Sequence, residues 1–241
     1  MTDSTTWYTD DVTLYSYGTL LRMSFRQGVV TGPLIFLFFA FRKAIGWRFR
    51  ATYGTALPDR LPIIPGDQIP EQVRNAMALA LAACRDAGFT VCFAMQPALI
   101  GGKSAYLVGM LDRAGTTYAT AVWFRLTVGQ QSAEKVVLSC HSQTLAETEL
   151  HTGPSDGSAD RGLIMPGYEL LELPDDATPD DAISAHAQRI ESRTDLVQFN
   201  NDSLAPHSLA ESRRYFQWRV EQGYLVPLTP DEVRRLGGEQ S

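Results

Sequence analysis

The chain is poor in cysteine, with Cys84, Cys92 and Cys140 as its three thiols among 241 residues. Three widely spaced cysteines match neither a disulfide framework nor the paired Cys-x-x-Cys ligands of a zinc site, so we expect free, buried or half-buried thiols. The N-terminus lacks the basic and apolar regions of a secretory signal, because residues 1–11 are polar and acidic. These absences favour a reducing cytoplasm as the compartment.

An excess of basic charge is also missing. The 27 acidic residues outnumber the 21 basic ones, which gives a formal net charge of −6. Phosphate backbones repel such a chain unless one face is locally basic, so nucleic acid is not expected as a partner. The one local exception is a basic cluster formed by Arg42, Lys43, Arg48 and Arg50.

No apolar run is long enough to cross a membrane. The most hydrophobic stretch is Leu34 to Phe41, and 15 residues separate Arg26 from Arg42 on either side of it. A helix of that length rises about 22 Å, which is short of the roughly 30 Å hydrocarbon core of a bilayer. A full membrane span is therefore not expected.

The apolar segment, residues 28–41, has two open interpretations. Because it is apolar all round, it can be a helix buried in the protein or against a partner chain. Its basic and aromatic flank suits an interfacial helix that contacts headgroups and the acyl boundary. The candidate residues for membrane or partner contact lie within 28–50; they are Leu34, Phe36, Phe38, Phe39, Phe41, Arg42, Lys43 and Trp47.

Prolines between Gly54 and Pro70 predict an extended linker, and we place a domain boundary near Leu61. Residues 1–60 are then an N-terminal arm that carries the apolar segment. Residues 61–241 are expected to form a single α+β domain.

That domain begins with a helix from Pro70 to Ala87, which has Pro at its start, a stripe of apolar residues and Gly88 after its end. Short turn-rich breaks then separate stretches of β pattern. The predicted strands are Phe89 to Gln96, Lys103 to Asp112, Thr117 to Val128 and Glu134 to Ser142, with further candidates at Thr144 to Leu150 and Tyr168 to Leu173.

The expected fold is therefore α+β: an antiparallel meander of four to six strands packed against the preceding helix and C-terminal helices. The C-terminal helices are predicted from Thr178 to about Ser192, from Ser208 to Gln222 and from Thr229 onward. Both faces of Thr117 to Val128 are partly apolar, so a second layer must cover the sheet. The apolar N-terminal segment is one candidate for that cover.

Two short motifs resemble ligand-binding loops without completing them. The segment Gly101–Ser104 ends like a phosphate-binding loop, but Pro97 stands where the leading glycine is required and a strand follows instead of a helix. Asp156, Ser158 and Asp160 have the spacing that opens a calcium loop, but the bidentate glutamate at the twelfth position is absent. We interpret them as a hairpin connection and a solvated acidic loop.

No set of nucleophile, base and carboxylate is visible in the sequence. Neighbours in a strand point to opposite faces, so Cys140 and His141 cannot form a dyad, and Ser139 and His141 lie about 7 Å apart along one face. His186 shares a helix face with Ile183, which favours a hydrogen-bonded core histidine. Metal-ligand spacing of three or four residues is also lacking among His141, His151, His186 and His207.

The sequence thus predicts no cofactor, and the missing catalytic motif disfavours an enzyme. The leading hypothesis is a non-catalytic cytoplasmic interaction or structural module. One alternative is a peripheral protein attached to the inner face of the membrane through residues 28–50. The other is an enzyme of unknown reaction, which requires that the fold bring His141, His186 and a carboxylate into one pocket.

Overall fold

The structure is a computed structural model that describes residues 5–11, 13, 15–25, 31–47, 50–57, 59–128, 131–154 and 164–238. The acidic loop considered for calcium, Asp156 to Asp160, lies outside these residues, as does the start of the apolar segment, residues 28–30.

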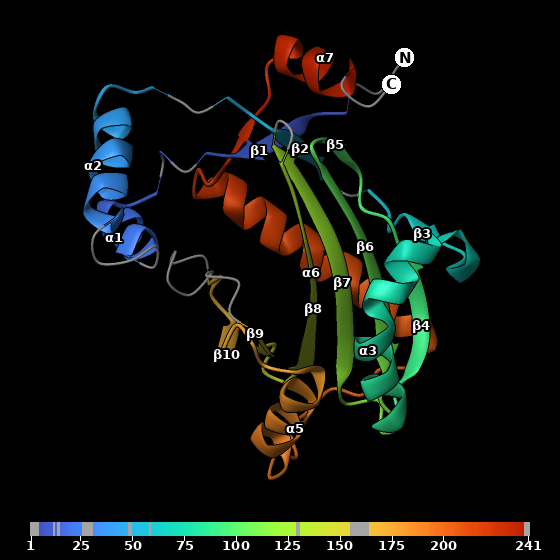
Figure 1. The fold of residues 1–241 in the computed structure, drawn as a ribbon. Helices are drawn as coiled ribbons and strands as arrows, with labels where there is room; N and C mark the ends of the chain where they lie inside the picture. The colour runs from blue at the N-terminus through green and yellow to red at the C-terminus, as the bar shows by residue number, and fades with distance from the viewer. Residues whose placement is uncertain are drawn as a thin grey trace.

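Helices and strands follow one another in a mixed order (Figure 1). The elements are β1 (Trp7–Asp10), α1 (Tyr17–Phe25), α2 (Thr31–Ala44), β2 (Tyr53–Ala56), β3 (Ile63–Ile64), the 3-10 turn η2 (Gly66–Gln68), α3 (Glu71–Asp86), β4 (Thr90–Met95), β5 (Leu99–Gly101), β6 (Lys103–Leu111), β7 (Tyr118–Val128), β8 (Gln131–Gln143), β9 (Glu149–Pro154), β10 (Tyr168–Leu173), α5 (Pro179–Ile190), α6 (Asn201–Glu221), β11 (Leu225–Pro227) and α7 (Pro230–Gly238).

Within the described residues the strands form two sheets. The larger has seven strands in the order β10-β9-β8-β7-β6-β4-β3, and the smaller has four in the order β11-β1-β2-β5. Every strand pair in both sheets is antiparallel except β9 with β10, which is parallel. The expected α+β class and the antiparallel meander from β6 to β8 are confirmed.

The expectation of a single sheet of four to six strands is wrong in two respects. Ile63–Ile64 adds a seventh strand at one edge of the larger sheet, and β5, which lies between two of the predicted strands, pairs with β2 in a second sheet. Both strands are two or three residues long, too short to produce a readable alternation. The pairing of β2 with β5 crosses the expected boundary near Leu61, and the division at residue 60 stays a prediction.

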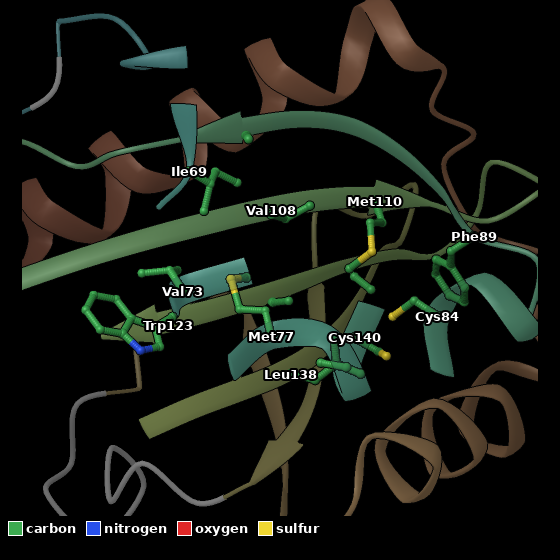
Figure 2. Packing of buried hydrophobic residues seen from close by; sticks show 14 residues of the cluster. Ile69, Val73, Met77, Cys84, Phe89, Val108, Met110, Trp123, Leu138 and Cys140 are labelled. Atoms are coloured by element: carbon green, nitrogen blue, oxygen red, sulfur yellow. The ribbon is translucent and has the colours of Figure 1, made fainter. Parts of the chain in front are cut away.

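One face of the seven-stranded sheet is covered by α3 and α5, which also contact each other. Apolar residues of α3 at helical spacing, Val73, Met77 and Cys84, meet the strand residues Ala121 and Cys140 in the main core (Figure 2). All three cysteines lie in the described part of the chain and are free thiols. Burial raises the pKa of the Cys140 thiol to about 12, as expected of an inert core cysteine.

The opposite face of the sheet is covered by α6. In Figure 1 α3 lies in front of the sheet and α6 crosses behind it. Leu204 at the start of α6 packs with Phe93, Leu111 and Tyr118 of the strands. The suggestion that the apolar N-terminal segment covers this face is therefore wrong, because the C-terminal helix takes that place.

The apolar segment instead forms α2, which pairs with α1 in a helical hairpin at one end of the molecule (Figure 1). Phe36 and Phe39 of α2 pack on Tyr15, Leu20 and Tyr224. None of the helices in the described part of the chain is long and apolar enough to cross a membrane.

Candidate functional site

A cavity of about 320 Å³ lies between the α6 face of the seven-stranded sheet and α6 itself. Its size falls at the lower end of the range of about 300–1,000 Å³ that small-molecule sites occupy. Part of its wall is apolar, formed by Phe93, Met95, Leu107, Val137, Ile164, Met165 and Leu170. The polar part of its wall is formed by Tyr118, Thr120, Ser139, His141, His151, Tyr168, Glu172, Ser208, Glu211, Ser212 and Tyr215.

The strand register brings the polar groups together. Tyr118 of β7 lies opposite His141 of β8, and His141 lies opposite His151 of β9. Because side chains alternate along a strand, Glu149 projects to the same face as His151. The α6 residues of the wall are spaced three or four apart, so they share one helix face. The site is therefore formed by alternate residues of three strands, β7, β8 and β9, and by the residues on one face of α6.

Glu149 is the centre of this arrangement, with 1% of its surface exposed. The Tyr118 hydroxyl donates a hydrogen bond to Glu149 Oε1. His141 Nδ1 lies 3.6 Å from Oε1, and His207 Nε2 lies 3.7 Å from Oε2. Both histidines are thus at ion-pair distance, slightly beyond a hydrogen bond, and Oε2 has no hydrogen-bond partner. A buried carboxylate therefore keeps one acceptor atom unused.

The surroundings stabilise the charged form of this carboxylate. Burial alone raises the pKa of Glu149, but His141, His207 and the Tyr118 hydroxyl outweigh it and lower the pKa to about 2. The pKa of the Tyr118 phenol shifts in the opposite direction. Burial and the adjacent Glu149 carboxylate raise this pKa well above its usual value. At neutral pH the site therefore holds a buried anion beside a neutral phenol.

The aromatic rings stack around Glu149. The Tyr118 and His141 rings are stacked with centroids 4.8 Å apart, and the His141 and His151 centroids are 4.5 Å apart. Burial, followed by the nearby charge of His141, lowers the pKa of His151 well below its usual range. A neutral imidazole has one donor and one acceptor nitrogen, so His151 can offer either to a bound molecule.

His141 also contacts a hydroxyl. Its Nε2 lies 2.9 Å from Thr120 Oγ1, while its Nδ1 faces Glu149. The ring thus lies between a hydroxyl and a carboxylate, which is the arrangement that a general base requires. Sequence spacing did not reveal this set, because Thr120, His141 and Glu149 come from three different strands.

A second polar group lies at the α6 wall. The Tyr168 hydroxyl donates to Glu211 Oε2, and Arg214 Nη2 donates to the same oxygen at 2.9 Å. Burial and Glu211 raise the pKa of Tyr168, so this phenol also stays neutral. The contact fastens β10 to α6 and defines one side of the cavity.

His186 does not belong to the cavity. It lies on the α5 face of the sheet, where its two ring nitrogens are each 2.9 Å from a hydroxyl, Ser142 Oγ and Thr152 Oγ1. The expectation of a hydrogen-bonded core histidine is confirmed. Cys140 likewise lies in the core on the α3 face while His141 lines the cavity, so the two residues point to opposite faces as predicted.

The residues proposed for membrane or partner contact divide into two groups. Phe36 and Phe39 are half-buried within the hairpin. The remaining apolar candidates are exposed, namely Leu34, Phe38, Phe41 and Trp47. Arg42 and Lys43 lie in the last turn of α2. Burial of the whole segment is therefore excluded, and contact with a membrane or partner stays a prediction.

Among the described residues no cluster of three or more His, Cys, Asp or Glu side chains is arranged to hold a metal ion. Lys103, of the loop that resembled a phosphate site, places its ammonium 4.6 Å from the centre of the Tyr53 ring and begins strand β6. Compared with protein-family models, curated proteins and solved structures, the chain gives no match in any of the three.

Proposed function

We propose that the protein binds a small amphiphile, with an apolar body and an uncharged or cationic head that donates hydrogen bonds, in the cavity between the sheet and α6. This proposal makes the expected non-catalytic module more specific. The observation that carries it is the cavity itself, in which an apolar wall lies beside the polar side chains of Tyr118, His141 and His151.

The apolar wall selects the body of the ligand. Aliphatic and aromatic side chains from β4, β6, β8 and β10 supply a surface from which a hydrocarbon chain displaces water. Burial of apolar area contributes about 25 cal/mol per Å², so covering this wall favours a ligand with an apolar body.

Charge selects the head of the ligand. Glu172 and Glu211 line the cavity, whereas the described lining residues include no Lys or Arg. An anionic head is therefore disfavoured by like charge. A hydroxyl or ammonium instead donates to the acceptor nitrogen of a neutral His151, which lines the cavity.

Isothermal titration with 1-decanol, decylamine and decanoate tests the proposal on the full chain. We expect binding of the alcohol and the amine and at least about tenfold weaker binding of the carboxylate, equivalent to about 1.4 kcal/mol. Ser212→Phe fills the cavity from α6 and is expected to abolish binding. Ser184→Phe, the same change at an exposed position of α5, is the matched control and should bind normally.

Equal binding to Ser212→Phe and wild type would show that the probes sit elsewhere. Preference for decanoate would contradict the charge argument. A folded Ser212→Phe protein is recognised by an unchanged circular dichroism spectrum, so loss of binding is distinguished from loss of structure.

A second candidate function is hydrolysis of an ester in the same cavity. The observation that favours it is the 2.9 Å contact between Thr120 Oγ1 and His141 Nε2, with Glu149 at the other ring nitrogen. His141 can take the proton of the Thr120 hydroxyl, or of a bound water, as the oxygen attacks an acyl carbon. The proton then passes to the departing alkoxide, which leaves as an alcohol. On the Thr120 route this leaves an acyl-threonine ester; a water molecule that gives its proton to His141 then attacks the acyl carbon, and the Thr120 oxygen leaves with that proton as the carboxylic acid is released.

Release of p-nitrophenol from p-nitrophenyl decanoate measures this activity. Turnover that falls at least about a hundredfold in both Thr120→Val and His141→Gln supports the Thr120 route. Loss only in His141→Gln points to attack by water. If the wild-type protein releases p-nitrophenol no faster than buffer alone, the hydrolysis candidate is contradicted and ligand binding is kept as the proposed function of the cavity.

A further inference from the structure

The outward face of α2 is an exposed apolar surface. Leu34, Leu37, Phe38 and Phe41 recur every three or four residues, so they share one side of the helix. Their exposed fractions are 69%, 61%, 51% and 60%, and Ile45 just after the helix is 52% exposed. Scattered exposed leucines are ordinary, but a row of large apolar side chains along one helix marks a contact surface.

This surface is held in a defined position. The inner side of α2 packs Phe36 and Phe39 on the buried Tyr15 and Leu20. At Gly32 the two helices of the hairpin approach so closely that a Cβ atom would lie 2.9 Å from the Phe25 Cα atom. The inner side of α2 is thus packed on α1 and on Tyr224 near the C-terminus, and the outward apolar face is turned away from this cluster.

The charge around the hairpin is of one sign. From Val12 to Pro58 the chain has six of its 21 basic residues and none of its 27 acidic residues. The rest of the protein is correspondingly acidic, since the whole chain carries a net charge of −6. A positive region on an acidic protein directs that region toward an anionic surface.

Cations and an aromatic ring meet at the end of the apolar face. The Arg42 guanidinium lies 4.4 Å from the centre of the Trp47 ring and donates to the Trp47 carbonyl oxygen at 3.2 Å. Lys43 Nζ donates to the Thr13 carbonyl oxygen at 2.8 Å. Trp beside Arg and Lys at the edge of an apolar helix is the arrangement found where acyl chains give way to headgroups.

We propose that the α1–α2 hairpin attaches the protein to the surface of an anionic phospholipid bilayer. The side chains of Leu34, Leu37, Phe38 and Phe41 enter the acyl boundary, and Trp47, Arg42 and Lys43 lie at the level of the headgroups. The helix lies along the surface, because its 14 residues rise only about 21 Å.

Charge favours a bilayer over a second copy of the chain. A symmetric dimer through α2 brings two hairpins of the same positive charge together, and neither hairpin has an acidic residue to pair with the other. An anionic bilayer neutralises these charges while it covers the apolar face.

Co-sedimentation of the full chain with vesicles tests the proposal. We expect binding to vesicles of phosphatidylcholine mixed with phosphatidylserine, weaker binding to pure phosphatidylcholine, and loss of most of the difference at high salt. The double variant Leu37→Ser/Phe41→Ser should lower the partition coefficient at least about tenfold, because two large apolar side chains no longer enter the bilayer. Arg42→Gln/Lys43→Gln should reduce the preference for phosphatidylserine.

The matched control is Leu79→Ser/Leu145→Ser, which removes two apolar side chains that are even more exposed, 81% and 71%, and lie far from the hairpin in sequence. It should bind like wild type. Equal loss in both double variants, or no binding of wild type to either vesicle, would overturn the proposal. A wild-type dimer in light scattering that Leu37→Ser/Phe41→Ser converts to a monomer, without vesicle binding, would assign the face to a second copy instead.

Discussion

Burial of His186 makes the folding stability of this protein depend on pH. Burial, followed by the charges of His141 and Arg189, lowers the pKa of His186 to about 3. Both ring nitrogens already have hydroxyl partners, Ser142 and Thr152, that can donate or accept, so the neutral ring is fully satisfied. Protonation in the folded state is therefore unfavourable, whereas the unfolded chain takes up the proton near pH 6.5.

This difference in pKa predicts that the protein becomes less stable as the pH falls. Above about pH 6.5 the stabilisation by neutral His186 is fully present, and as pH falls toward 3 it is lost at up to about 1.4 kcal/mol per pH unit. We expect urea unfolding of His186→Gln to show a pH slope between 6.5 and 5 that is smaller by about one proton. Glu149 adds a further loss only below about pH 4.5, since its folded pKa is about 2.

Gln188→Ala, at an exposed position on the same helix α5, serves as the control and should keep the wild-type slope. An identical slope in His186→Gln and wild type would mean that His186 titrates alike in the folded and unfolded chain, contrary to its surroundings.

Alternation along a strand predicts the faces of individual residues but not their distant partners. The opposite faces of Cys140 and His141 followed from the strand pattern alone. Glu149 was placed at the end of a candidate strand, whereas β9 begins there, and nothing near it in sequence marks it as buried. Its partners Tyr118 and His207 come from β7 and α6 and meet it only through sheet register and helix crossing.

Among the elements, α6 shows why a helix start can be misplaced. The sequence predicts this helix from Ser208 to Gln222, a start that leaves Pro206 outside the helix. In the structure the helix begins at Asn201 and contains Pro206 in its interior. The start signal is at Asn200, whose side chain accepts from the backbone N–H groups of Asp202 and Ser203 at 3.0 and 2.9 Å.

The Ser203 hydroxyl in turn accepts from the Asn200 backbone N–H at 2.9 Å, which completes a capping box. Asn200→Ala should therefore destabilise the protein by about 1 kcal/mol, read from urea unfolding. Gln217→Ala, at an exposed position inside the same helix, should change the stability by less than about 0.5 kcal/mol. Similar effects of the two variants would show that the helix starts after Pro206 instead.

The first turn of α6 also bears on the cavity. Leu204 anchors this turn in the core against Phe93 and Tyr118, and the cavity-facing residues Ser208 and Glu211 follow one and two turns later. The cap therefore positions a wall of the candidate site as well as a helix end.

For the molecule as a whole, the seven-stranded sheet separates two environments. Its α3 face carries the dense core around Met77 and Cys140, and its α6 face carries the cavity lined by Tyr118 and His141. The sequence predicted that both faces are covered, because both sides of Thr117 to Val128 are partly apolar. It did not predict which segment covers the second face, since the apolar run at 34–41 is a stronger hydrophobic signal than α6.

The smaller sheet is tied to α6 by a partly buried ion pair. Arg219 Nη2 of α6 donates to Asp10 Oδ1 at the end of β1, and the Tyr53 hydroxyl of β2 donates to Asp10 Oδ2. The Asp10 and Arg219 side chains are only 23% and 18% exposed, so removal of one partner leaves the other charge poorly solvated. This contact links the four-stranded sheet to the helix that covers the cavity.

Asp10→Ala is therefore expected to destabilise the protein by about 2–4 kcal/mol and to speed amide hydrogen exchange in β1, β2 and β11 more than in β6 to β8. The matched control is Asp231→Ala, which breaks the highly exposed ion pair with Arg234 and should cost less than about 1 kcal/mol. Exchange that accelerates uniformly over both sheets would contradict a local link, because it would mean that the two sheets open only together.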